Sequence, residues 1–164
     1  MASILKVDEI QDISGKKILQ NTGGVLQVVS TTKKDTYSQT ATSYTEVTGL
    51  TATITPTSSS SKILVMVGVL AGYDDGGTVT RRAGFSIFRG STNLIVPTSA
   101  YCSTNIGFSF LDSPATTSAT TYSVRAKNNG GSGSVLYVNR GQDDDDSTIT
   151  IRGNSTITLF EISA

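Results

Sequence analysis

Histidine is absent from all 164 residues of the chain. Imidazole is the base of Ser-His-Asp and Cys-His sites and a common zinc ligand, so its absence removes most hydrolase mechanisms together. Glutamate is nearly absent too, since only Glu9, Glu46 and Glu161 occur. Little is therefore left for a carboxylate-pair glycosidase. We expect a protein that is not an enzyme and that uses no cofactor.

Cysteine, surplus charge and long apolar runs are also missing. Cys102 is alone, so no disulfide can close within the chain. The 13 basic and 13 acidic residues cancel, which leaves no electrostatic footprint for nucleic acid or an anionic membrane. No run approaches the ~18 apolar residues of a membrane span, and residues 1–9 lack the regions of a signal peptide. We expect a soluble protein made in the cytosol, with no nucleic-acid partner and no membrane insertion.

What is abundant favours β-structure. Val, Ile and Thr supply 51 residues, and β-branched side chains suit a pleated surface better than a helix. Ser and Thr number 47, with 16 Gly and only three Pro, which is typical of short strands joined by polar turns. The composition predicts an all-β fold, an antiparallel β-sandwich or jelly roll.

Apolar and polar residues alternate in several segments, as expected for strands with one buried face. The inward residues predicted in three of these segments are Leu50, Ala52 and Ile54; Ile106, Phe108 and Phe110; and Tyr122, Val124 and Ala126. Two other segments, 63–70 and 155–162, carry apolar residues on both faces. One small sandwich covers only one face of each sheet, so a symmetric oligomer, a homotrimer, is expected to cover the other.

The pattern divides the chain into a turn-rich β segment at 1–30 and a sandwich domain at 31–164. The first segment holds apolar pieces too short to form a core, and an isolated hairpin is marginal in water. A flexible tail is the alternative. We expect docking onto other chains instead, through Leu5, Val7, Ile10, Ile18 and Leu19.

Several strings in the sequence resemble the tail fibre and virion appendage proteins of marine tailed bacteriophages. The opening 2–10 and 14–21 are similar to their N-terminal attachment segment. The strings similar to their C-terminal domain are 47–50, 54–56, 61–65, 89–91, 111–114 and 120–122.

This resemblance implies a trimeric jelly roll of the tumour necrosis factor type and a structural role in the virion. It implies a homotrimer that contacts other virion proteins through the N-terminal segment. A tail fibre, a baseplate or neck fibre, and a capsid spike or decoration all fit. A carbohydrate-binding module that recognises a host surface glycan is the alternative main role.

Two groups of residues are candidate sites. Asp143, Asp144, Asp145 and Asp146 could offer hard oxygen ligands to Ca²⁺, but without the spacing of an EF-hand loop we favour a solvated turn and no metal. Tyr73 and Tyr101 lie near predicted loops, where aromatic rings can stack on sugars. The alternative is that these tyrosines pad the bases of loops with the phenol tip in water.

Overall fold

The computed structural model describes residues 10–11, 13–14, 17–19, 23–74, 83–95, 98–100, 104–144 and 152–164. The regular elements in these ranges are all strands, and no helix there could cross a membrane. The strands are β1 (Ile10–Gln11), β2 (Lys17–Leu19), β3 (Val25–Lys33), β4 (Tyr37–Gln39), β5 (Thr45–Ile54), β6 (Lys62–Asp74), β7 (Ala83–Arg89), β8 (Thr92–Asn93), β9 (Thr98–Ala100), β10 (Thr104–Asp112), β11 (Thr120–Asn128), β12 (Val135–Val138) and β13 (Ser155–Ile162).

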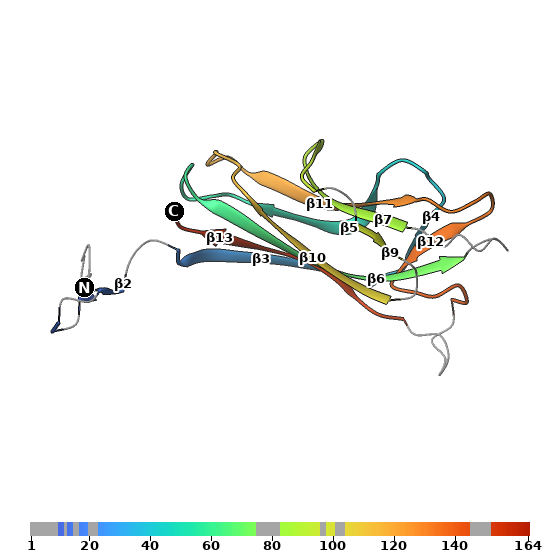
Figure 1. Ribbon diagram of the computed structural model, residues 1–164, viewed down its shortest axis with the longest axis horizontal. Helices are drawn as coiled ribbons and strands as arrows, with labels where there is room; N and C mark the ends of the chain where they lie inside the picture. The colour runs from blue at the N-terminus through green and yellow to red at the C-terminus, as the bar shows by residue number, and fades with distance from the viewer. Residues whose placement is uncertain are drawn as a thin grey trace.

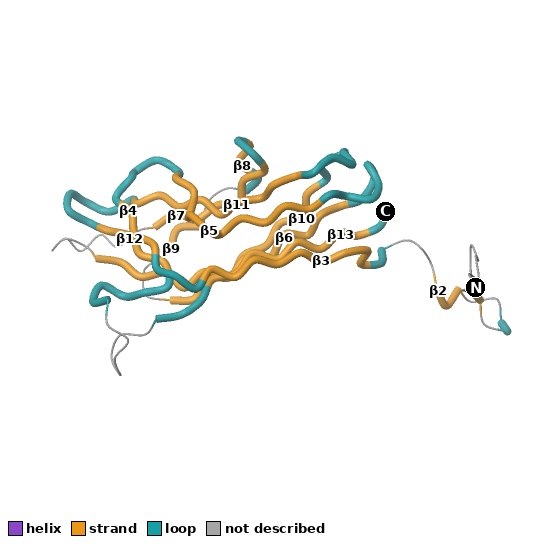
Figure 2. The backbone as a smooth tube through the Cα atoms, turned by 180° about the vertical axis from the view of Figure 1, so that it is seen from behind, coloured by secondary structure: helices purple, strands orange, loops and turns teal. Residues whose placement is uncertain are grey.

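Two antiparallel sheets face each other (Figures 1 and 2). The six-stranded sheet has the order β3-β13-β6-β12-β4, and β10 pairs with the free side of β6. The five-stranded sheet has the order β5-β11-β7-β8, with β9 also paired to β7. The chain is therefore an all-β antiparallel sandwich of the jelly-roll type, and the predicted fold class is confirmed.

The core lies between the sheets and consists of side chains from the facing sides of both. The predicted alternation in β5 and β11 is confirmed, because all six inward residues there are buried. In β10, Ile106 is buried, while Phe108 and Phe110 are partly buried and pack against the core. The largest fully buried apolar side chains are Tyr122, Phe85, Leu50, Ile54, Ile63, Ile87, Leu136, Ile157 and Leu159.

A bulge in β5 changes which residues face the core. Val47 and Leu50 are both fully buried, although an odd spacing would place them on opposite faces of a regular strand. The pairing of β5 with β11 shifts in this stretch, and Gly49 adopts a positive φ of 82°. Glycine takes this conformation without strain, so the bulge turns both side chains inward.

Strand β3 crosses the predicted domain boundary at residue 30. Its residues from Val25 to Lys33 pair with β13, so the sandwich begins several residues before position 31. Just before β3, Gly23 N donates to Ser163 O and Ser163 N to Gly24 O, both at 2.9 Å. These bonds tie the start of the sandwich to the last strand. By contrast, β1 and β2 form a two-stranded sheet of their own.

The single chain covers only one face of the six-stranded sheet. In β6, Ile63, Val65 and Val67 are buried, whereas Leu64 is half-buried and Met66 is 48% exposed. In β13, Ile157 and Leu159 are buried, and the alternate residues are partly exposed. The apolar residues on the second face are therefore open in the single chain.

Candidate functional site

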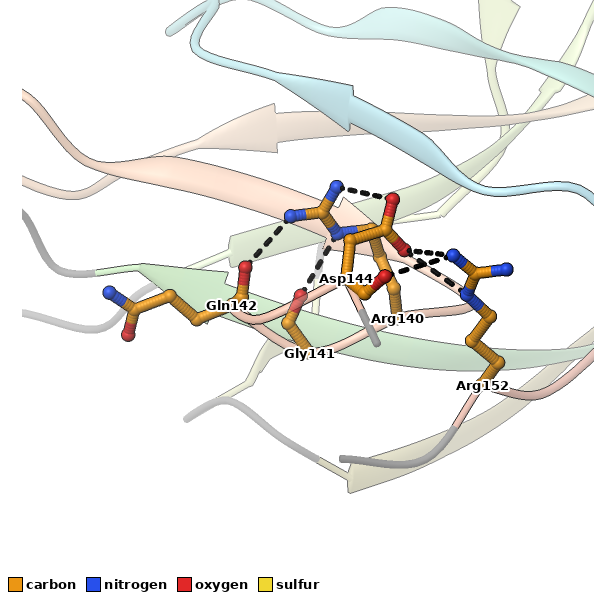
Figure 3. Close-up of polar contacts among 5 residues, drawn as sticks. All are labelled: Arg140, Gly141, Gln142, Asp144 and Arg152. Carbon is orange, nitrogen blue, oxygen red and sulfur yellow. Dashed lines mark hydrogen bonds and ion pairs between the residues drawn. The ribbon is translucent and has the colours of Figure 1, made fainter. Parts of the chain in front are cut away.

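The Asp143–Asp146 stretch begins in a loop that three charged side chains hold together (Figure 3). Asp144 Oδ2 lies 3.0 Å from Arg140 Nη1, and Asp144 Oδ1 lies 3.0 Å from Arg152 Nη2. Arg140 also donates to backbone oxygens of its own loop, from Nε to Gly141 O at 3.0 Å and from Nη2 to Gln142 O at 2.8 Å. The guanidinium groups therefore close the loop and link it to the chain before β13.

This arrangement suits a structural loop better than a cation site. Both carboxylate oxygens of Asp144 already face guanidinium groups, which a metal ion would have to displace. Asp143 is exposed, and the residues that the structure describes include no group of three or more potential metal ligands. Asp145 and Asp146 lie outside the described residues. Asp144 is ion-paired on both oxygens, and the interpretation of the stretch as a solvated turn without metal stays a prediction.

The candidate glycan contact Tyr73 is a buried residue near the end of β6. It is 5% exposed, and its hydroxyl donates to Asn128 Oδ1 at 2.5 Å. Asn128 in turn donates from Nδ2 to Ser134 O at 2.7 Å and accepts from Gly130 N at 2.8 Å. A Cβ at Gly130 would lie 1.7 Å from the Tyr73 hydroxyl, so this packing requires glycine.

The contacts of Tyr73 therefore hold the loop between β11 and β12. A ring in this position offers no face to a sugar, and the predicted glycan contact does not fit it. Tyr101, the second candidate, lies outside the described residues.

Of the predicted anchoring residues, three lie on described strands. Ile10 is in β1, and Ile18 and Leu19 are in β2, where Ile10 and Leu19 are register partners. Leu5 and Val7 lie outside the described residues. The structure brings Ile10 and Leu19 together, and the anchoring role of all five stays a prediction.

A buried polar bridge between the two sheets was missed by the sequence analysis. Asp112 in β10 accepts on Oδ2 from Tyr122 Oη and from Arg89 Nη1, each at 2.7 Å, and both donors belong to the other sheet. Burial, together with the Asp112 carboxylate, raises the pKa of Tyr122. Asp112 has the same strand parity as Ile106, which is the signal that could have placed it inside.

A second missed group is Glu161 in β13, which is fully buried. Its carboxylate accepts from Gln27 Nε2 at 2.6 Å, and from Thr57 N and Thr57 Oγ1 at 2.7 Å. Burial alone would raise the pKa of Glu161, but these hydrogen bonds outweigh it and hold the pKa at about 2. Glu161 shares the parity of Ile157 and Leu159, so strand alternation could have found it as well.

The outer faces of the two sheets differ in character. On the five-stranded sheet, the Arg125 guanidinium lies 4.2 Å from the Phe88 ring centroid and Lys127 Nζ lies 5.1 Å from that of Tyr44. The hydroxyls of Thr53 and Thr121 are 2.8 Å apart on the same side. This face is polar and carries charge, whereas the outer face of the six-stranded sheet carries Val28, Met66 and Leu111, each about half exposed.

Comparison with known proteins adds little to this description. No family model matches the chain, and neither does any curated protein. Among solved structures it is similar to the structure of infectious bursal disease virus, Gx strain, with 14% identity and a TM-score of 0.40 over 100% of this chain and 43% of that one. A crystal structure of the VP2 subviral particle of the same virus shows 14% identity and a TM-score of 0.40 over 84% and 38%.

The chain thus spans about two fifths of the length of these two matches. At this identity and TM-score, the class of the protein rests on its own strand pairing: an antiparallel jelly-roll sandwich with a separate two-stranded segment. Neither match concerns a tailed bacteriophage, so the resemblance to phage appendage proteins stays a prediction.

Proposed function

We propose that the chain is a non-enzymatic structural protein of a tailed bacteriophage virion, built as a homotrimeric fibre or spike. The N-terminal segment attaches the trimer to other virion proteins, and the sandwich projects from the particle. The position on the particle is a tail, neck or capsid appendage. The strings that resemble phage appendage proteins support this proposal at the level of sequence.

The structural observation that carries the proposal is the division of the chain. The strands β1 and β2 pair only with each other among the described strands, whereas β3 to β13 form the two sheets of the sandwich. A two-stranded piece of this size is marginal in water, so its apolar residues gain most from contact with another chain. A projecting domain with a short attachment segment has this organisation.

The polar groups that could have suggested chemistry have structural contacts. Glu161 receives three hydrogen bonds, Asp112 bridges the sheets, and Asp144 closes a loop between two arginines. A carboxylate pair for glycoside hydrolysis must flank one glycosidic bond, with one group acting as the acid and the other as the base or nucleophile. These contacts support a non-enzymatic role.

The proposal can be tested on purified particles of the virus that encodes the chain. An epitope tag placed after Ala164 should band with intact particles in a density gradient, and gold-labelled antibody should mark one kind of appendage by electron microscopy. A tagged chain that stays entirely in the soluble lysate, while particles assemble normally, would contradict the virion role. Depolymerisation of a capsular polysaccharide by the purified protein would contradict the non-enzymatic role.

A further inference from the structure

The outer side of the six-stranded sheet presents an ordered surface across four strands, which we call the open face. The strand registers align its residues in rows that run across β10, β6, β13 and β3. The first row is apolar throughout, and the next two rows contain small or hydroxyl residues and one methionine. The rows are Leu111, Leu64, Phe160 and Val28; Ser109, Met66, Thr158 and Ser30; and Gly107, Gly68, Thr156 and Thr32.

No residue in these three rows is charged, although charged residues make up 16% of the chain; the exposed Lys62, in the next row of β6, marks the limit of this uncharged area. A sheet face that stays in water normally carries polar and charged side chains, as the outer face of the other sheet does with Arg125 and Lys127. Charges on a surface that meets a copy of itself near a symmetry axis would be buried against their like. A second copy of the chain is therefore the partner that these three uncharged rows fit.

Exposed apolar side chains concentrate on the same sheet. Six large hydrophobic residues are exposed in the part of the chain that the structure describes, and one of them, Ile13, precedes β2. The other five lie on strands of the six-stranded sheet, and none on the five-stranded sheet. These five are Val25, Leu26, Val28, Met66 and Leu111.

The apolar row lies at the end of the sandwich where the N-terminal segment joins. Val28 is in the first half of β3, and the residues just before this strand are bonded to Ser163. Copies that met through the apolar row would thus bring their N-terminal segments together at one end. This is the geometry that an attachment point shared by several chains needs.

We propose that the open face is the surface through which copies of this chain associate, with the row of Val28, Phe160, Leu64 and Leu111 nearest the axis. The inference rests on the proposed homotrimer and names its interface. Four strands about 4.8 Å apart and three rows about 7 Å apart give roughly 400 Å² of projected face. A standard interface takes about 800 Å² from each partner, so the contact extends onto the neighbouring edges, β3 or β10.

Light scattering of the full chain and of two variants tests the interface. The double variant Met66→Asp with Leu111→Asp places charges at exposed positions of the open face, where the single chain tolerates them. The control Thr53→Asp places one such charge at an exposed position on the outer face of the five-stranded sheet. We expect a wild-type mass of three chains, an unchanged mass for the control, and a dissociation constant raised about 100-fold or more for the double variant.

The outcomes separate the two proposals. A wild-type monomer at micromolar concentration would overturn the homotrimer and the interface together. A double variant that remains a trimer would overturn the interface alone. If the double variant loses the circular dichroism of a folded β protein, Ser109→Arg, at an exposed polar position of the same face, decides in its place: a folded monomer supports the open face, and a folded trimer overturns it.

Discussion

At the residue scale, polar side chains on the inward face of strands hold this sandwich together. Asp112 and Glu161 both lie where alternation calls for an apolar residue, and each receives several hydrogen bonds from neighbouring strands or loops. A buried carboxylate without partners costs several kcal/mol, whereas one with well-placed donors is tolerated. Their partners come from distant parts of the chain, so these groups also fix the pairing of elements.

Glu161 makes stability depend on pH in acid. Its pKa is depressed from an ordinary value of 4.5 to about 2, so its contribution is complete above pH 4.5 and is lost as the pH falls through 2. We expect Glu161→Gln to lower the free energy of unfolding at pH 7 by about 1–3 kcal/mol, because a neutral amide accepts these hydrogen bonds less well. The variant should also lose stability less steeply than the wild type between pH 4.5 and 2.

Urea unfolding at several pH values and one protein concentration measures both effects. The control is Glu46→Gln, which removes an exposed carboxylate from β5. A Glu161→Gln variant with the wild-type pH profile would show that the buried carboxylate does not cause the acid dependence.

Gly72 in β6 is a second position where one added atom should lower stability. A Cβ there would lie 2.0 Å from the carbonyl oxygen of Arg140, and backbone cannot move aside as a flexible side chain can. We expect Gly72→Ala to lower the free energy of unfolding by about 1–3 kcal/mol. Gly24→Ala, just before β3, is the matched control, because an added Cβ there would meet only Ser163 Oγ, at 3.8 Å. Thermal scans measure both variants, and equal changes in melting temperature would contradict the clash assigned to Gly72.

At the scale of elements, β3 belongs to the sandwich and separates the fold from the segment before it. It is the outer neighbour of β13 and supplies Gln27 to the Glu161 carboxylate. Removing part of this strand leaves one side of β13 unpaired and takes from the buried Glu161 carboxylate its hydrogen bond from Gln27. A division of the chain should therefore be made just before Gly23, where the described sandwich begins.

Two truncations test this division. Deletion of residues 1–22 should leave the melting temperature of the sandwich unchanged while the protein no longer joins particles. Deletion of residues 1–30 removes most of β3, so we expect the melting temperature to fall by roughly 10 °C or more, or aggregation. Thermal scans with circular dichroism and co-sedimentation with particles measure the two outcomes. If the 1–22 deletion unfolds, the N-terminal segment belongs to the core; if it still joins particles, the anchor lies elsewhere.

At the scale of the whole molecule, the proposed association through the open face would couple assembly to stability. If only folded chains can form the trimer, trimerisation stabilises the folded state by mass action. We expect the melting temperature of the wild type to rise with protein concentration over the micromolar range. Differential scanning calorimetry at several concentrations measures this, with a known monomeric β-sandwich as the control. A melting temperature independent of concentration would contradict a reversible trimer.

The sequence by itself determined the fold class and most of the strands. Period-two alternation in β5, β10 and β11 is a local property, because successive side chains of any strand point to opposite faces. The missing histidine likewise excluded whole classes of chemistry without reference to any fold. The two-sided apolar character of β6 and β13 was also visible, since it needs only the composition of each strand.

Only the tertiary structure decided where the individual side chains lie. The sequence placed Tyr73 near a loop, but its hydroxyl is buried and donates to the distant Asn128. The sequence also grouped four aspartates, but Asp144 forms ion pairs with Arg140 and Arg152. The pairing of β3 with β13 moved the start of the sandwich to before residue 31. The burial of Tyr73 and the place of β3 depend on contacts between residues far apart in the chain, which are set by sheet order and register. The ion pairs of Asp144 are closer in the chain but depend on how its loop folds back. Local periodicity encodes neither.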